Sequence, residues 1–281
     1  MKTGVIDVGG GMRGIYAAGV LDSCLDGGVS FDIAIGISSG SANLASFCAR
    51  QRSRSFRFYT NYALREEYMG THLLRTIGSF FDMDYVYGTL SNSDGEDPLD
   101  YAALRDNPTD YIVVATDAET GEARYFGKGD MAQDNYDILK ASSSMPYLCK
   151  PYPIGGRVYY DGDVGDPVPV AKALELGCER IVLILSEPVG ERRDPKKDEK
   201  LARRVERLYS ASADKVRTRA ERYNDGVEHA LRLAAEGRAL IIAPDDTCGV
   251  DALTRDKDAM LRLYEKGLSD GGQIRAFMGE S

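Results

Sequence analysis

The apolar residues near the start of the chain alternate between short continuous runs and longer stretches with helical spacing. Residues 3–8 and 31–35 are runs rich in Val and Ile, each followed by glycine, and they predict two buried β-strands. Apolar side chains from Ile15 to about Gly27, and again over residues 41–48, predict a helix after each strand. This order of strand, glycine-rich turn and helix is typical of a parallel sheet covered by helices.

Later segments extend the predicted sheet. Residues 111–116 predict a strand that forms a hairpin with residues 123–126. Residues 181–185 form another fully apolar run, and residues 240–244 predict the last strand. Residues 53–94 contain many apolar and aromatic side chains but no clear strand.

A basic segment separates the last two predicted strands. Residues 192–222 contain twelve Lys or Arg and six Asp or Glu, which leaves a local surplus of six positive charges. Apolar residues recur there at steps of three or four, from Leu201 to Leu231. The pattern predicts one long amphipathic helix, or two in tandem.

Length and composition narrow the class of protein. A chain of 281 residues allows one large domain or two smaller ones, and 43% hydrophobic with 28% charged residues is ordinary for a globular protein. The net charge of −9 argues against nucleic acid as a partner. No apolar run is long enough for a signal peptide or a membrane span, and the five cysteines form no CxxC pair. We therefore expect a cytoplasmic protein with reduced thiols.

A G-x-S-x-G motif follows the second predicted strand and precedes a helix. Gly36 and Gly40 flank Ser38, and glycine suits a turn too sharp for side chains on either side. The turn would present the Ser38 hydroxyl at a helix N-terminus, whose dipole favours developing negative charge. Ser38 is therefore the candidate nucleophile.

A second glycine-rich loop follows the first predicted strand. It runs from Gly9 through Gly10, Gly11 and Arg13 to Gly14. A dinucleotide-binding loop would require an acidic residue closing the second strand, where Asp32 stands at its start instead. An oxyanion hole needs the same backbone N–H donors and no such carboxylate. A purely structural glycine turn is the other interpretation.

The base that would activate Ser38 is the next question. His72 lies in an amphipathic stretch and His229 in the charged helix, so neither follows a strand in a loop, as a triad histidine does. Asp161, followed by Gly162, comes directly after the short apolar strand at residues 158–160. Asp161 is therefore the candidate base, with a solvated turn residue as the alternative.

These motifs together resemble those of the patatin-like phospholipase family, in the same order along the chain. Besides the two glycine motifs and residues 161–163, the Ala-Ser-rich stretch at residues 141–146 resembles the family, so the resemblance covers roughly residues 3–190. The nearest variety is the small bacterial patatin-like protein with a helical C-terminal extension. The resemblance implies a patatin-like three-layer α/β/α sandwich with a mostly parallel sheet over residues 1–190. It also implies a mainly helical extension over residues 191–281.

The resemblance further implies a serine acyl hydrolase of the phospholipase A or lysophospholipase type. Ser38 and Asp161 would form a catalytic dyad, and the N–H groups of Gly10 and Gly11 would form the oxyanion hole. The partner would be a lipid or another acyl ester, and neither a metal nor a cofactor is expected. A general carboxylesterase for short acyl esters and a non-catalytic lipid-binding regulatory protein are the alternatives. The sequence carries no signal of oligomeric state.

Three features leave questions for the structure. Asp163 stands where the family's third motif usually ends in Gly or Ala, so it either raises the pKa of Asp161 or points to solvent. The aromatic stretch at residues 68–87 is either a lid over an acyl-binding slot or the packing of two helices. The basic segment is either a solvated helix or a peripheral contact with anionic membranes. The side chains in the membrane hypothesis are Arg203, Arg204, Arg207, Lys215, Arg217 and Arg219.

Overall fold

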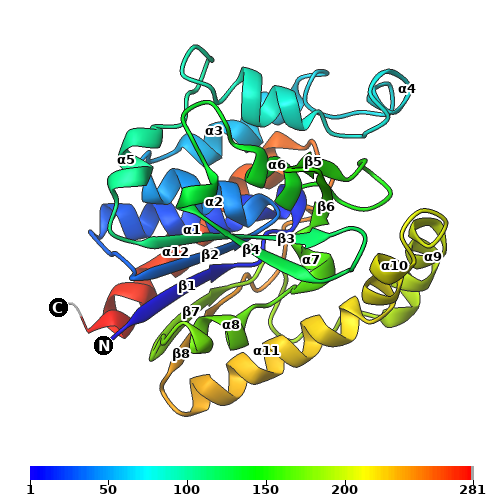
Figure 1. The fold of residues 1–281 in the computed structure, drawn as a ribbon. Helices are drawn as coiled ribbons and strands as arrows, with labels where there is room; N and C mark the ends of the chain where they lie inside the picture. Colours follow the sequence, from blue (N-terminus) through cyan, green and yellow to red (C-terminus); the bar gives the residue numbers. More distant parts are fainter. Residues whose placement is uncertain (280–281) are drawn as a thin grey trace.

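The computed structural model describes residues 1–279, and within them one eight-stranded mixed sheet separates two layers of helices (Figure 1). The strand order is β5-β6-β3-β2-β1-β7-β8, with β4 paired to β3 beside this path. Strands β3, β2, β1, β7 and β8 run parallel to one another, whereas β4 and β6 each pair antiparallel with β3, and β5 pairs antiparallel with β6. The strands are β1 Thr3–Asp7, β2 Ile33–Ile37, β3 Asp110–Asp117, β4 Ala123–Gly127, β5 Tyr152–Ile154, β6 Arg157–Asp161, β7 Arg180–Ile184 and β8 Ala239–Ile242.

Helices cover both faces of the sheet, which confirms the predicted three-layer α/β/α architecture (Figure 1). The helices and helical turns of the first half are η1 Gly11–Gly14, α1 Ile15–Asp26, α2 Ser39–Cys48, α3 Arg54–Thr60, η2 Tyr62–Leu64, α4 Leu73–Thr76, η3 Tyr85–Thr89, α5 Tyr101–Asp106, η4 Lys128–Asp130 and α6 Asp137–Ser142. Those of the second half are α7 Gly162–Gly165, α8 Val170–Glu175, α9 Pro195–Val205, α10 Ser210–Arg217, α11 Arg219–Ala235 and α12 Lys257–Met278.

Each face of the sheet has its own apolar core. Side chains of α1, α2, α3 and α12 pack on one face, where Tyr16 and Leu44 are fully buried. Side chains of α8 and α11 pack on the other face, for example Val170 and Val227. A third, smaller cluster joins Tyr160 of β6 to helices α9 and α10. The strands in the middle of the sheet are buried on both faces, which explains why they appear in the sequence as continuous apolar runs.

The basic segment differs from the sequence-based expectation of one helix or two in tandem. It forms three helices, α9, α10 and α11, with bends at residues 206–209 and at Thr218. Arg222 donates hydrogen bonds to the carbonyl oxygens of Lys215, Val164 and Gly165. This guanidinium caps the end of α10 and joins the bend at Thr218 to α7, because it satisfies helix-terminal carbonyls from both elements.

The last part of the chain belongs to the same sheet and the same core. Strand β8 pairs with β7, and α12 lies along α1 (Figure 1). The two helices approach so closely that a Cβ added at Gly267 would lie 2.0 Å from the Tyr16 carbonyl oxygen. A Cβ at Gly19 would lie 2.2 Å from the Tyr264 carbonyl oxygen. Glycine at both positions therefore allows backbone-to-backbone packing of α1 on α12.

We predict that Gly267→Ala destabilises the protein by about 1–3 kcal/mol, because the added methyl group forces the two helices apart. Gly272→Ala is the matched control, since a Cβ at Gly272 of the same helix meets nothing within 4 Å. The control should stabilise the protein by about 0.5–1 kcal/mol through helix propensity alone. Urea unfolding of both variants measures the difference, and equal effects would contradict the close packing.

Candidate active site

Two strands meet end to end along one edge of β3, and this brings Ser38 close to Asp161. Strand β4 pairs with β3 over Ile112–Thr116, so β2 and β6 must share the opposite edge. Ile37 at the end of β2 pairs with Val114, and Asp161 at the end of β6 pairs with the next residue, Ala115. The residue after β2 therefore faces the last residue of β6, although 123 positions separate them in the sequence.

Ser38 occupies a strained turn between β2 and α2. Its backbone has φ 54° and ψ −133°, a left-handed conformation that non-glycine residues seldom adopt, and the residue is 7% exposed. Its N–H donates to Ser142 Oγ at 2.9 Å, and Ser142 Oγ–H donates to the Val114 carbonyl at 2.6 Å. These two bonds tie the strained turn to α6 and β3.

The glycines around Ser38 are required by close packing. A Cβ on Gly36 would lie 2.4 Å from Ser41 Cα, and one on Gly40 would lie 2.4 Å from the Asp7 carbonyl oxygen. Gly40 thus allows the Ser38 turn to pack against the end of β1. Gly162 has the same role beside Asp161, because its Cβ would lie 2.3 Å from the Val114 carbonyl oxygen.

The first glycine-rich loop borders the same cavity as Ser38. Gly10 has φ 128°, and both Gly10 and Gly11 line the cavity. Within residues 1–279 no hydrogen bond uses the Gly10 N–H, and the Gly11 N–H opens η1, where N–H groups have no intrahelical acceptor. Gly9 and Gly14 hold the loop, since the Gly9 N–H donates to Asp7 and the Gly14 carbonyl accepts from Asn43.

Asp7 is a buried carboxyl that links this loop to α2. It is 1% exposed, accepts the Gly9 N–H at 2.9 Å and accepts Asn43 Nδ2 at 3.0 Å. Burial raises the pKa of Asp7 to about 6, although both hydrogen bonds favour the charged form. Sequence analysis missed Asp7. Its position as the polar end of a buried strand, directly before the glycines, was the available signal.

Asp161 is a buried carboxyl with a strongly perturbed pKa. It is 2% exposed and its Oδ1 accepts the Asp163 N–H at 2.9 Å. Burial, assisted by the negative charge of Asp163, raises the pKa of Asp161 to about 7. Hydrogen bonds from the Asp163 N–H and the Ser38 side chain oppose this rise, as does the charge of Arg219. A carboxyl with a pKa near neutrality can exchange protons at physiological pH.

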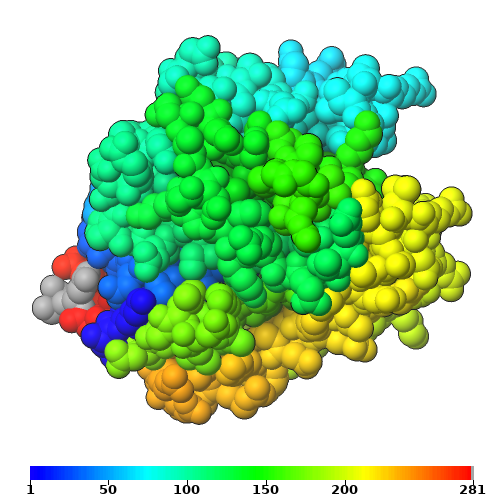
Figure 2. All heavy atoms as spheres, viewed as in Figure 1, coloured from blue at the N-terminus to red at the C-terminus, as the bar shows by residue number. Residues whose placement is uncertain are grey.

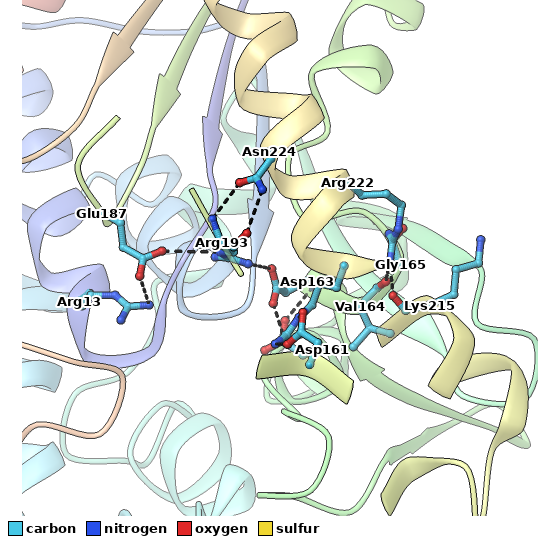
Figure 3. A network of polar contacts seen from close by, with 12 residues as sticks. Arg13, Asp161, Asp163, Val164, Gly165, Glu187, Arg193, Lys215, Arg222 and Asn224 are labelled. Carbon is cyan, nitrogen blue, oxygen red and sulfur yellow. Dashed lines mark hydrogen bonds and ion pairs between the residues drawn. The ribbon is translucent and has the colours of Figure 1, made fainter. Parts of the chain in front are cut away.

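Asp163 does not point to solvent. It forms an ion pair with Arg193 at 2.8 Å (Figure 3) and another with Arg219 at 3.0 Å. Burial alone would raise the pKa of Asp163, but these two guanidinium groups lower it to about 2. Asp163 therefore stays ionised and, of the two expectations from the sequence, raises the pKa of its neighbour Asp161.

The same contact corrects the role expected of Arg219. Its guanidinium forms ion pairs with Asp163 of α7 and Asp198 of α9, so Arg219 is not a free surface cation. Arg217 pairs with three carboxylates, and Lys215 pairs with Glu122. Of the six side chains, Arg203, Arg204 and Arg207 are the exposed ones. Figure 2 shows the segment that bears them, α9–α10 in yellow, protruding on the same side as the cyan segment around α4.

Two cavities of different character meet at Ser38. The larger, about 580 Å³, lies between the glycine-rich loop, Asp161 and α9. The smaller, about 60 Å³, is a mainly apolar slot whose walls include Phe58, Tyr68 and Phe81. Met145 lines both cavities. An ester bond at Ser38 would therefore have an apolar group on one side and a polar group on the other.

Some residues of the aromatic stretch at 68–87 line the apolar slot, and others pack in the core. Phe81, Met83 and Tyr87 line the apolar slot, whereas Met69 and Leu73 are buried in the core. Leu74 and Ile77 are large apolar side chains of the stretch that are exposed. His72 is exposed at the start of α4 and His229 is half-buried on α11, and neither lines either cavity.

Arg13 and Arg193 meet at one carboxylate. Arg13 Nη2 lies 3.3 Å from Glu187 Oε1, and Glu187 Oε2 lies 3.6 Å from Arg193 Nε. Glu187 and Arg193 were not among the residues that sequence analysis selected. Neither belongs to a motif, and only the fold brings them to the cavity. Within residues 1–279 no group of His, Cys, Asp and Glu is arranged to hold a metal ion, and no helix is long and apolar enough to cross a membrane.

Comparisons with known proteins agree with the fold and motifs. The family model described as patatin-like phospholipase matches residues 8–174, so this chain belongs to the patatin-like phospholipase family. The resemblance found in the sequence motifs is thereby confirmed. A second model, a domain of unknown function (DUF6363), matches residues 209–278.

Individual relatives are distant. The uncharacterised protein YjjU of Escherichia coli K12 is 27% identical over 182 residues, which is 64% of this chain and 50% of that protein. The uncharacterised NTE family protein Rv1063c of Mycobacterium tuberculosis is 27% identical over 29% of this chain and 22% of its own length. The chain thus spans about half of the length of YjjU and less than a quarter of the length of Rv1063c. The crystal structure of VipD from Legionella pneumophila aligns with a TM-score of 0.48 at 11% identity, covering 97% of this chain and 66% of that one.

We predict that Asp161→Asn makes the protein more stable, and increasingly so as the pH rises. Because the pKa of Asp161 is raised to about 7 in the folded state, ionising it costs folding free energy that is absent below about pH 4 and complete above pH 7. Asn removes this cost, up to about 4 kcal/mol, and keeps the acceptor for the Asp163 N–H. Urea unfolding at pH 5 and pH 8 tests this: a gain that does not grow between the two would contradict the raised pKa.

Proposed function

We propose that this protein hydrolyses acyl esters of lipids, as a phospholipase A or lysophospholipase, through a Ser38–Asp161 dyad. The observation that carries the proposal is a strained serine and a buried carboxyl in one cavity, beside backbone N–H groups without acceptors and an apolar slot. Membership of the patatin-like phospholipase family supports lipid esters as the substrate class.

The chemistry begins with attack of Ser38 Oγ on the ester carbonyl carbon. The hydroxyl proton passes to Asp161, whose pKa near 7 makes its carboxylate a stronger base than an ordinary aspartate. The carbonyl oxygen becomes an oxyanion that accepts the N–H groups of Gly10 and Gly11. When the tetrahedral intermediate collapses, the alcohol leaves with the proton from Asp161, and the acyl group stays on Ser38.

Release of the acyl group repeats these steps with water. Asp161 takes a proton from water as the water oxygen attacks the acyl carbon, and the same N–H groups hold the second oxyanion. Collapse returns the proton to Ser38 Oγ and frees the fatty acid. The apolar slot lined by Phe58, Tyr68 and Phe81 would hold the acyl chain in both steps.

We expect Ser38→Ala to abolish hydrolysis without unfolding the protein, because it removes one hydroxyl and little packed volume. Asp161→Asn should lower kcat/KM by about 10²–10⁴-fold, the usual contribution of an acid–base group. His72→Ala and His229→Ala are the controls and should retain activity, since neither side chain lines the cavities. The assay uses acyl esters of graded chain length, phospholipids included.

A fluorophosphonate probe provides a second measurement of the same assignment. It should label the wild-type protein at Ser38 and leave Ser38→Ala unlabelled. Loss of activity in either histidine variant, or labelling that persists in Ser38→Ala, would refute the dyad. A preference for short esters would favour a general carboxylesterase over a lipid hydrolase.

We also propose peripheral contact with anionic membranes through Arg203, Arg204 and Arg207. These side chains are exposed around the end of α9, next to Leu208, which is 76% exposed. A basic residue close to an anionic bilayer contributes about 1 kcal/mol, so the three contribute about 3 kcal/mol. Contact here would bring the bilayer close to the larger cavity, which Arg204 also lines.

We expect the protein to co-sediment with anionic vesicles at low salt and to be released at high salt. Changing Arg203, Arg204 and Arg207 to Gln should abolish this binding. The matched control changes Arg105, Arg124 and Arg238 to Gln, which removes the same charge from exposed positions elsewhere. Equal binding to neutral vesicles, or equal loss in the control, would refute the contact.

A further inference from the structure

A continuous chain of charged groups crosses the larger cavity from the glycine-rich loop to Asp161 (Figure 3). It runs from Arg13 to Glu187, from Glu187 to Arg193 and from Arg193 to Asp163. The last link is a backbone one, from the Asp163 N–H to Asp161 Oδ1 at 2.9 Å. The side chain of Arg193 therefore acts on Asp161 through the residue that hydrogen-bonds to it.

The guanidinium of Arg193 is itself held firmly by α11. It lies 3.6 Å from the centre of the Tyr223 ring, a cation–π contact. The Arg193 N–H donates to Asn224 Oδ1 at 2.9 Å, and the Arg193 carbonyl accepts from Asn224 Nδ2 at 3.0 Å. Backbone and side chain of Arg193 are both fixed, so the residue can impose a position on Asp163.

Arg219 holds the other oxygen of the same carboxylate. Arg193 Nη1 donates to Asp163 Oδ1 and Arg219 Nη1 donates to Asp163 Oδ2. Because Arg193 binds one carboxylate oxygen and Arg219 binds the other, the Asp163 side chain is held in one orientation. Its backbone N–H, in the first turn of α7, then donates to Asp161.

We propose that Arg193 is a positioning residue of the active site, which holds the Asp161 loop in its reactive arrangement by ion-pairing with Asp163. The inference rests on the proposed function, in which Asp161 is the base. Arg193 touches neither substrate nor the reacting atoms in this role. It belongs to the segment outside the part of the chain that the patatin-like model matches, residues 8–174.

The charges around Asp161 determine what the pH dependence should be. Asp163 on α7 raises the pKa of Asp161, and Arg219 on α11 lowers it, while Arg193 and Arg222 offset the charge of Asp163. Tyr87 and Cys149 also face Asp161 and stay neutral, because burial raises the pKa of each. Removing the Arg193 charge should therefore raise the pKa of Asp161, and removing the Asp163 charge should lower it.

The test is the pH profile of kcat/KM on a soluble acyl ester for Arg193→Met and Asp163→Asn. Because the base must be ionised, activity falls below the pKa of Asp161. We expect this acidic limb to move up by about one pH unit in Arg193→Met and down by a similar amount in Asp163→Asn. Arg193→Lys should restore the wild-type limb with a lower kcat, because it keeps the charge and loses the paired geometry.

Arg238→Met is the control, since this exposed arginine forms its ion pair with Glu236 and lines neither cavity. It should leave both kcat and the acidic limb unchanged. Arg193 would be merely structural if Arg193→Met and Asp163→Asn lost activity equally with the limb unmoved. Thermal unfolding of each variant shows whether it is folded, and if Arg193→Met is not, Arg193→Lys and Asp163→Asn carry the test.

A second readout does not depend on activity. The gain in stability from Asp161→Asn starts at the unfolded-state pKa, about 4, and stops growing at the folded-state pKa of Asp161. The upper limit of this pH range therefore reports the ionisation of Asp161 in the folded protein, and Arg193→Met should move that limit to higher pH. An inactive wild-type protein with a shifted upper limit would refute the proposed function and leave the role of Arg193 supported. A fully active wild type with an unmoved acidic limb and an unmoved upper limit would refute the role of Arg193 alone.

Discussion

The register of β3 is the constraint on which the candidate site depends. Strand β2 ends opposite Val114 and β6 ends opposite Ala115 on the same edge, so Ser38 and Asp161 meet at the junction of two strands. A shift of β6 by one residue would turn the Asp161 side chain to the other face of the sheet. The hydrogen bond from Thr116 Oγ1 to the Asp161 carbonyl, at 2.7 Å, holds this register where it matters.

Burying carboxylates at this junction costs folding free energy, and two arginines from the later part of the chain, Arg193 and Arg219, offset that cost. Asp7 and Asp161 both lie in the interior with raised pKa values, and Asp163 lies between Asp161 and two arginines. A carboxylate pair side by side is unfavourable without cations. Arg193 and Arg219, which lie outside the patatin-like match, supply them through their ion pairs with Asp163.

Much of the fold could be predicted from the sequence because its strands are short, apolar and followed by glycine. The runs at residues 3–8, 111–116 and 181–185 are strands in the structure, and the hairpin of β3 with β4 is confirmed. The bend of the basic segment at Thr218 could not be predicted, since Arg222 holds it by donating to carbonyl oxygens of α7 and α10.

The candidate site divides in the same way. The motifs around Ser38 and Asp161 are local, and their glycines are explained by contacts that leave no room for a Cβ. The roles of the two residues remain predictions. The environment of Asp163 could not be predicted, because its partners Arg193 and Arg219 lie 30 and 56 positions further along the chain. The periodicity of the basic segment predicted that Arg219 lies on its charged outer face.

The contact of α1 with α12 also has a consequence for how the chain folds. Helix α1 (residues 15–26) packs against α12 (residues 257–278), so α1 is synthesised long before the helix that covers it. Contacts of such long range slow folding, because a large loop must close before they form. Until then the part of α1 that α12 covers, with Tyr16 and Gly19, is exposed on the nascent chain. Incompletely packed chains of this kind are prone to aggregate.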